Sequence, residues 1–330
     1  NQLLAKATQH LQAQQWDKAD RVLRKALKQS PNDPDILQRL GGVQRRLGQP
    51  KKAMDILERA MSAAPENTLL ASEYAEAMID LGRTSDAIEW LGRAIGSHPD
   101  DTGLLALRGR IRYQLGDLHG ACDDCRAASA LAPDDLELLA RWIDAMIADG
   151  SAPMDDEPAR RLVERQPFST RNHSRLGSVH RLNGCLDEAM DCYRRSIELD
   201  ATNSDAIAGM AEVHESRGDS QAAVDLLAPH VHTTGAAFPV LTAWLRSMFR
   251  LKQWDDAART AMAWIDAAPR SSQQTALIHH RIGNAYDRAG RPDEAFDAWR
   301  RGNEPHATAW DADEHTRLTD SLIGTYSSRM

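Results

Sequence analysis

The chain has 330 residues, a formal net charge of −8, 42% hydrophobic residues and only 5% aromatic residues. The acidic balance argues against nucleic-acid binding, which needs a basic stripe, and no run of about eighteen apolar residues is present to form a membrane-spanning helix. Four cysteines are too few for a disulfide framework in a chain of this length, which predicts a reducing, cytoplasmic compartment.

Proline recurs every 34 residues, at Pro31, Pro65, Pro99, Pro133 and Pro167. A fixed period of this size is typical of a repeat architecture. We number each repeat so that this proline is position 32, which places eight units in one unbroken register. A ninth unit follows after four extra residues and contains Gly283, Gly290 and Ala295.

Three positions of the repeat carry small residues. Positions 8 and 20 are mostly Gly or Ala, as in Gly41 and Ala53, and small side chains there let two helices approach closely. Position 15 is Gly in six of the first eight units, where a positive φ ends the first helix. Apolar residues at helical spacing, as in Leu40, Val43 and Leu47, complete the pattern of two amphipathic helices per unit.

This pattern resembles the tetratricopeptide repeat, a helix–turn–helix unit of 34 residues, over nearly the whole chain. The resemblance implies an all-α, right-handed superhelical solenoid of about nine units over residues 1–307. A C-terminal capping and linker segment follows at 308–330, where Leu318, Leu322 and Ile323 predict an amphipathic helix from Asp311 to Tyr326.

The repeat is irregular at 153–158 and at 228–239. Pro153 and Pro158 forbid a full second helix in the fifth unit, so we expect a loop from Ser151 to Glu157 and then a short helix. Pro229 and Gly235 are expected to shorten the second helix of the seventh unit. Each irregularity is interpreted as a decayed repeat or as a bend in the superhelix.

The register argues against catalytic and metal chemistry. Cys122 and Cys125 have the spacing of half a zinc site, but Cys125 falls on a core position of the repeat. The histidine pairs at 230/232 and 279/280 lack a third ligand with suitable spacing, and no phosphate-binding loop or nucleophile motif occurs. We therefore expect no catalytic residue, no metal and no cofactor in this chain.

The remaining candidate is the concave groove, which the first helix of each unit lines in this repeat type. Position 9 alternates in charge along much of the chain, and arginine, which suits bidentate carboxylate contacts, recurs at other inner positions. This alternating row of charges at position 9 is interpreted either as ion pairs between repeats or as a polar groove for an extended peptide. The predicted partner-binding residues are Arg45, Glu76, Arg110, Asp144, Arg171, Arg181, Glu212, Arg246, Arg250, His280, Asn284 and Arg288.

The segment from His279 to Tyr326 resembles the junction in bacterial fusions of tetratricopeptide repeats with a sulfotransferase domain, in which a last repeat ending in an asparagine like Asn303 leads through one more helix. That resemblance implies a non-catalytic repeat region that positions the acceptor of a larger enzyme.

The predicted function is therefore a non-catalytic scaffold that binds a protein or peptide in the groove, with no nucleic-acid or membrane partner. The alternatives are the substrate-positioning region of a sulfotransferase, and a homo-oligomer that pairs through apolar residues at the solenoid ends.

Overall fold

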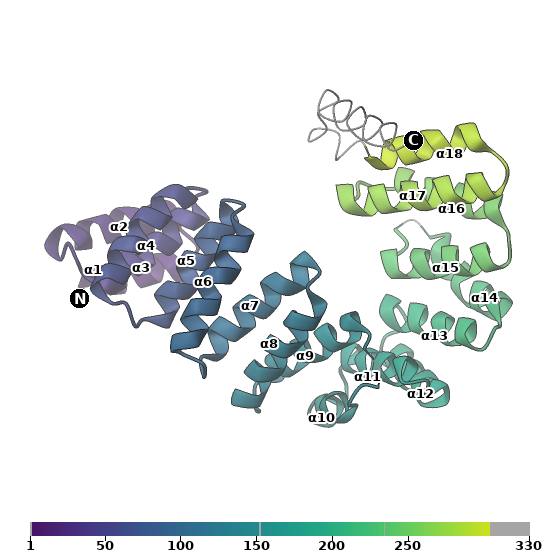
Figure 1. The fold of residues 1–330 in the computed structure, drawn as a ribbon, viewed down its shortest axis with the longest axis horizontal. Helices are drawn as coiled ribbons and strands as arrows, with labels where there is room; N and C mark the ends of the chain where they lie inside the picture. The colour runs from purple at the N-terminus through teal and green to yellow at the C-terminus, as the bar shows by residue number, and fades with distance from the viewer. Residues whose placement is uncertain (1, 152, 234, 304–330) are drawn as a thin grey trace, which may run out of the picture. The chain divides into compact units, whose positions relative to one another are not determined.

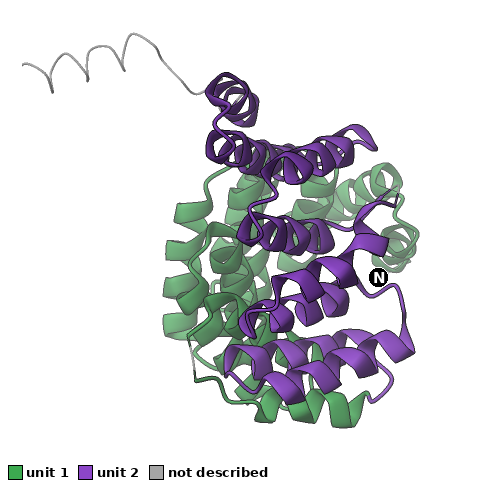
Figure 2. Ribbon diagram, turned by 90° about the vertical axis from the view of Figure 1, so that its right-hand side faces the viewer, with its two compact units in different colours: residues 1–166 green, residues 167–330 purple. Residues whose placement is uncertain are grey.

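The computed structural model describes residues 2–151, 153–233 and 235–303. Eighteen α-helices make up the regular structure of these residues, and they follow one another as helical hairpins (Figure 1). The chain divides into two compact units, unit 1 at residues 1–166 and unit 2 at residues 167–330 (Figure 2). Unit 1 holds α1–α10, and the described part of unit 2 holds α11–α18. The all-α solenoid architecture predicted from the sequence is confirmed.

The odd-numbered helices are the first helices of the nine hairpins. They are α1 (Gln2–Gln12), α3 (Pro34–Arg46), α5 (Thr68–Asp80), α7 (Thr102–Leu115), α9 (Leu136–Asp149), α11 (Thr170–Leu182), α13 (Ser204–Ser216), α15 (Phe238–Arg250) and α17 (Ser272–Arg288).

The even-numbered helices are the second helices. They are α2 (Trp16–Gln29), α4 (Pro50–Ala63), α6 (Thr84–Ser97), α8 (Leu118–Leu131), α10 (Glu157–Arg165), α12 (Leu186–Leu199), α14 (Ser220–Val231), α16 (Trp254–Asp266) and α18 (Pro292–Asn303).

The first helices begin at a capping residue that recurs at position 34 of the repeat. Asp33 Oδ1 accepts hydrogen bonds from the backbone N–H groups of Asp35 and Ile36, and Asn67 Oδ1 accepts from the matching pair in α5. Such caps satisfy backbone donors that have no partner inside the helix. The same position carries Asp101, Asp135, Ser169 and Asn203, each of which caps its helix through the side chain.

The first helices end at position 15 in a left-handed residue. The glycines of this position have positive φ, from 69° at Gly48 to 81° at Gly116. Two hydrogen bonds close the turn, as in the contacts of Gly48 N with Arg45 O and of Gln49 N with Gln44 O. Gln14 and Lys252, which replace glycine in the first and eighth units, adopt the same conformation, with φ of 54° and 60°.

Close contact between the two helices of a hairpin explains the glycines of position 8. A Cβ atom added to Gly41 would lie 2.6 Å from the Leu57 side chain, and one added to Gly177 would lie 2.8 Å from the Tyr193 ring. Leu57 and Tyr193 are both fully buried, and both occupy position 24 of their repeats. Glycine at position 8 therefore leaves room for a large core residue on the second helix.

The first irregularity has the predicted form. After a loop, α10 begins at Glu157, has nine residues and holds Pro158 in its first turn. Asp155 Oδ1 accepts a hydrogen bond of 3.0 Å from the Glu157 backbone N–H, so the acidic run lies at the helix N-terminus as expected.

The second irregularity shortens its helix, as predicted. The helix α14 is shorter than α12, with 12 residues against 14, but it continues through Pro229 to Val231. Gly235, with φ of 99°, lies in the following loop.

The four extra residues before the ninth unit form helix. The helix α17 has 17 residues where α15 has 13, and it begins at Ser272, four residues before the position at which other first helices begin. An α-helix has 3.6 residues per turn, so the insertion adds about one turn at the N-terminus of α17 and leaves the register of the unit intact. The helix predicted from Asp311 to Tyr326 lies outside the described residues.

Candidate functional site

Three predicted groove residues of unit 1 meet on consecutive first helices. Glu76, on α5, accepts from Arg45 Nη1 of α3 through its Oε2 atom and from Arg110 Nη2 of α7 through its Oε1 atom, the latter at 3.1 Å. We call Arg45, Glu76 and Arg110 the unit 1 triad. Glu76 and Arg110 are one repeat apart at position 9, so the predicted contact between neighbouring first helices is present.

The same arrangement occurs in unit 2. Glu212, on α13, contacts Arg181 Nη2 of α11 through its Oε2 atom at 3.0 Å and accepts from Arg246 Nη1 of α15 through its Oε1 atom at 2.7 Å. We call Arg181, Glu212 and Arg246 the unit 2 triad. Each of its residues has the same repeat position, and contacts the same carboxylate oxygen, as its counterpart in the unit 1 triad.

The two triads differ in the charges around them. Arg45 also contacts Glu73 at 2.9 Å and Asp80 at 2.8 Å, so two guanidinium groups meet three carboxylates in unit 1. Burial lowers the pKa of Arg45, but its hydrogen bonds to the three carboxylates outweigh that effect and raise the pKa overall. The guanidinium of Arg45 is therefore held firmly in place by acidic neighbours.

Unit 2 has an additional cation instead. Arg281, on α17, is half-buried, and burial together with the charge of Arg246 lowers its pKa. An arginine side chain nevertheless stays protonated in proteins, so the repulsion is not relieved by losing a proton. Among the described residues, Arg281 forms no ion pair. The unit 2 triad with Arg281 therefore holds three guanidinium groups and one carboxylate, and we call these four residues the cationic cluster.

Other predicted groove residues of unit 2 have local partners. Arg250 lies 2.8 Å from the buried carboxylate of Glu215, and Asn284 accepts a 3.2 Å hydrogen bond from Trp299 Nε1. The Arg288 guanidinium lies over the Trp254 ring, 5.6 Å from its centroid. The half-buried His280 ring lies beside Gly302 of α18. These residues bind neighbouring helices of their own unit.

The last two predicted residues lie on α9 and α11. Asp144 is half-buried on α9, and Arg171 is exposed in the first turn of α11.

Four charged residues that contact or neighbour the predicted groove residues were not among the predicted ones. Asp80 and Glu215 occupy positions 13 and 12, which belong to the inner face, so an acidic residue there was a usable signal. Glu73 and Arg281 occupy position 6, which was not counted among the groove positions. Glu73 and Arg281 come close to the groove residues because their long side chains reach along the helix surface.

The cysteines behave as the register predicts. Cys125 is buried, and a Cβ atom added to Gly109 would lie 3.0 Å from its Sγ atom, so the thiol fills the space between α7 and α8. Within the described ranges, no three His, Cys, Asp or Glu side chains are close enough to hold a metal ion. None of the described helices combines the length and the apolar character that spanning a bilayer requires.

Comparison with known proteins agrees with the repeat assignment. Family models of the tetratricopeptide repeat match residues 10–61 and 45–111 in unit 1 and residues 170–203 in unit 2. Heat shock protein STI1 of Saccharomyces cerevisiae is 38% identical over 68 residues, a segment that spans 21% of this chain and 12% of that protein.

Two solved structures illustrate the similarity at low sequence identity. A tetratricopeptide repeat protein from Parabacteroides merdae is 16% identical, with a TM-score of 0.45, and the alignment covers 86% of this chain and 97% of that one. Yeast Tom70 is 14% identical, with a TM-score of 0.46, and the alignment covers 89% of this chain and 61% of that one.

Proposed function

This chain contains tetratricopeptide repeats, and we propose that it is a non-catalytic scaffold that binds an acidic peptide segment along the first helices of unit 2. The observation that carries the proposal is the cationic cluster formed by the unit 2 triad and Arg281. A carboxylate-bearing partner supplies the negative charge that this cluster lacks, and arginine binds carboxylates through paired N–H donors.

The two arginines of each triad have different roles in this proposal. Arg181 is 21% exposed and holds Glu212 in position, whereas Arg246 is 44% exposed and contacts the same carboxylate from the open side. A guanidinium has five N–H donors, so Arg246 keeps donors for a partner while it remains bound to Glu212. Exposed ion pairs contribute little to stability, so a partner carboxylate can also replace this contact at low cost.

The unit 1 triad provides a built-in comparison. Arg110 is 41% exposed, close to the value for Arg246, and it contacts Glu76 in the same way. The surrounding Glu73 and Asp80 make that site anionic, so an acidic peptide is repelled from it. The proposal therefore predicts binding at unit 2 and weak or no binding at unit 1.

Fluorescence polarisation with a labelled peptide tests this proposal. The probe is a hexapeptide of Gly, Ser and four Glu residues with a free C-terminus, and the same peptide with Gln in place of Glu is the control ligand. We expect the full chain to prefer the Glu peptide, and Arg246→Gln to weaken its binding about tenfold. Binding should also weaken as salt is added.

Arg110→Gln is the matched control variant, because Arg110 has the same repeat position in unit 1. It should leave the affinity within about twofold of the original. Equal losses for the two variants, or no loss for Arg246→Gln, would contradict the assignment to unit 2. Circular dichroism melting of both variants checks that the fold is intact.

Self-association is a second candidate function. Phe296, on α18, is 68% exposed, which is unusual for a large apolar side chain in the last described helix. A Phe296→Glu variant should shift an existing dimer to monomer in light scattering over a range of concentrations. A mass that stays constant in both proteins would dismiss this candidate.

The relationship to sulfotransferase fusions stays a prediction from residues 279–326. Residues 304–326 of that segment lie outside the described part of the chain. An assay of the full natural protein for sulfate transfer from an activated nucleotide donor tests it.

A further inference from the structure

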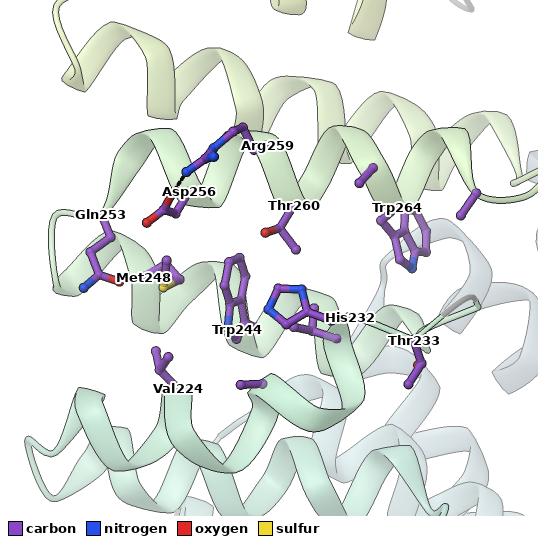
Figure 3. Close-up of a pocket in the computed structure, with 14 residues that line it drawn as sticks. Val224, His232, Thr233, Trp244, Met248, Gln253, Asp256, Arg259, Thr260 and Trp264 are labelled. Carbon is purple, nitrogen blue, oxygen red and sulfur yellow. Dashed lines mark hydrogen bonds and ion pairs between the residues drawn. The ribbon is translucent and has the colours of Figure 1, made fainter.

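Arg246 lies on the open side of α15, away from the side that packs. Trp244 and Met248 line a pocket of about 570 Å³ between α14, α15 and α16 (Figure 3). Each of these two residues is two positions from Arg246, which is a rotation of roughly 200° about the axis of an α-helix. The Arg246 side chain is accordingly 44% exposed, whereas Trp244 is buried. Arg246 therefore faces the groove and not the pocket.

Position 9 of one repeat contacts position 9 of the next repeat. Glu76 and Arg110 show this contact in unit 1 at 3.1 Å, and Glu212 and Arg246 show it in unit 2 at 2.7 Å. The residue at position 9 in the repeat after Arg246 is Asn284, on α17. The register therefore places the exposed Asn284 side chain next to Arg246.

Position 6 of the next repeat also comes close to position 9. In unit 1, a Cβ atom added to Gly42 would lie 3.5 Å from both carboxylate oxygens of Glu73. Gly42 and Glu73 have the same repeat positions as Arg246 and Arg281. Two guanidinium groups in unit 2 thus occupy the neighbouring positions at which unit 1 has a glycine and a carboxylate.

Arg281 is a cation that lies beside Arg246 without an acidic partner. Leu245 and Ile282, which are next in sequence to the two arginines, belong to one buried core cluster, so α15 and α17 pack together at this level. Burial and the charge of Arg246 lower the pKa of Arg281, and among the described residues Arg281 forms no ion pair. Only the Nε atom of its guanidinium is enclosed without a partner, so both Nη groups stay accessible. An anion bound between the two arginines relieves their repulsion.

Asn284 adds a neutral donor to this pair of arginines. Its Oδ1 atom accepts the 3.2 Å hydrogen bond from Trp299 Nε1, which can only donate, so the orientation of the amide is fixed. The Nδ2 group is therefore the part of the exposed amide that offers hydrogen bonds to another molecule. Asn284 follows Arg281 by three residues on α17, a spacing that puts both side chains on the same face of the helix. Arg246, Arg281 and Asn284 thus present donors to one region of the groove.

The net charge of the cationic cluster matches a phosphate group better than a carboxylate. Its three guanidinium groups and one carboxylate leave an excess of two positive charges. A phosphorylated side chain carries about −1.5 to −2 charges at pH 7 and has three strong acceptor oxygens, whereas a carboxylate has a single charge and two oxygens. Arginine also binds phosphate through paired N–H donors.

We propose that the acidic peptide of unit 2 carries a phosphorylated residue, whose phosphate is bound by Arg246, Arg281 and Asn284. This inference rests on the proposed function, because it names the acidic group that the same site selects. The phosphate lies between the two arginines, and Asn284 Nδ2 donates to one of its oxygens. Unit 1 does not offer this combination, since Gly42 and Glu73 stand at the two arginine positions.

Fluorescence polarisation with four labelled peptides tests the proposal on the full chain. The peptides are Gly-Ser-Gly-X-Gly-Ser amides, in which X is phosphoserine, sulfoserine, glutamate or serine. Sulfoserine has the tetrahedral shape of phosphoserine but only a single negative charge. We expect the phosphoserine peptide to bind about tenfold more tightly than the sulfoserine and glutamate peptides, and the serine peptide to bind most weakly.

Three variants locate the phosphate. Arg281→Gln should remove the preference for phosphate, so that the phosphoserine and glutamate peptides bind within about twofold of each other. Asn284→Asp keeps an acceptor for Trp299 but puts a carboxylate beside the arginines, so it should weaken phosphoserine binding about tenfold. Arg175→Gln is the matched control, because Arg175 has the same repeat position as Arg281 and donates to Asn172 Oδ1 at 3.0 Å. It should leave the phosphoserine affinity within about twofold, and circular dichroism melting checks the fold of each variant.

The possible failures of this proposal and of the proposed function are distinguishable. Equal binding of the phosphoserine and glutamate peptides, with both lost in Arg246→Gln, would overturn the phosphate assignment and leave the acidic-peptide site intact. A preference for phosphoserine that survives Arg281→Gln would overturn the assignment too. So would inorganic phosphate that binds as tightly as the phosphoserine peptide in competition, because the ligand would then be the free ion. If neither these peptides nor the four-Glu hexapeptide bind, the proposed function itself is wrong.

Discussion

Gln14 and Lys252 share a left-handed backbone conformation, with φ of 54° and 60°, at the position where the seven other repeats use glycine. Both residues close the same pair of turn hydrogen bonds as the glycines, for example from Lys252 N to Phe249 O and from Gln253 N to Met248 O. The repeat therefore imposes its turn geometry on residues that rarely adopt it, at a cost of about 1 kcal/mol each.

Lys252→Gly should stabilise the protein, because glycine adopts a positive φ without steric cost. The expected gain in the free energy of unfolding of unit 2 is about 0.5–1 kcal/mol, measured by urea denaturation. Gly218→Ala, at the same position one repeat earlier and with φ of 79°, should destabilise by a similar amount. A loss of stability in Lys252→Gly would contradict this account of the turn.

Gly41 and Gly42 are neighbours in α3 and should respond oppositely to alanine. A Cβ atom at Gly41 would lie 2.6 Å from the buried Leu57, whereas one at Gly42 would lie 3.5 Å from the nearest atom of Glu73. Gly41→Ala should therefore cost about 1–3 kcal/mol through overpacking. Gly42→Ala should gain about 0.5–1 kcal/mol from helix propensity. Thermal melting measures both effects: the melting temperature should fall in Gly41→Ala and rise in Gly42→Ala. Equal shifts in the two variants would contradict this explanation.

Asp124 should be important for the stability of unit 1. Its side chain is 4% exposed, and it accepts hydrogen bonds from Arg108 at 2.6 and 2.9 Å and from Arg112 at 2.9 Å. Asp124→Asn removes the charge that compensates two partly buried guanidinium groups, so we expect a loss of about 2–4 kcal/mol in chemical denaturation.

Asp123→Asn is the matched control for that variant. Asp123 is next in sequence, and it pairs with the exposed Arg126 at the protein surface. The control should change the stability by less than about 0.5 kcal/mol. Similar losses for both variants would show that burial of the ion pair is not the cause.

The cysteines should differ in reactivity. Burial, together with the nearby Asp124 charge, raises the pKa of Cys125 to about 11, whereas the Cys185 thiol is exposed. Alkylation requires the thiolate, which for Cys125 forms only as the pH approaches this value. Iodoacetamide at pH 8 should therefore label Cys185 well before Cys125 in peptide mass spectrometry. Urea should remove the difference, and fast labelling of Cys125 in the folded protein would contradict its burial.

The tertiary contacts explain which parts of the candidate site could be predicted. The alternation of charge at position 9 correctly indicated contacts such as Glu212 with Arg246, because a 34-residue step places equivalent residues on neighbouring helices. Arg288 has a suitable position too, but the Trp254 ring of the preceding repeat lies beneath it. What Arg288 contacts is therefore set by the neighbouring Trp254 side chain and not by the repeat register.

The register alone determined the repeated hairpins, the turns at position 15 and the placement of Cys125 in the core. Each of these follows from a local rule that recurs every 34 residues, namely glycine at a positive φ or a small residue facing a large one. The pocket beside Trp244 and the excess positive charge near Arg281 depend on three or more helices at once. Trp244 becomes buried and Arg281 is left without an ion-pair partner among the described residues only when those helices pack together. The tertiary structure therefore decided both features.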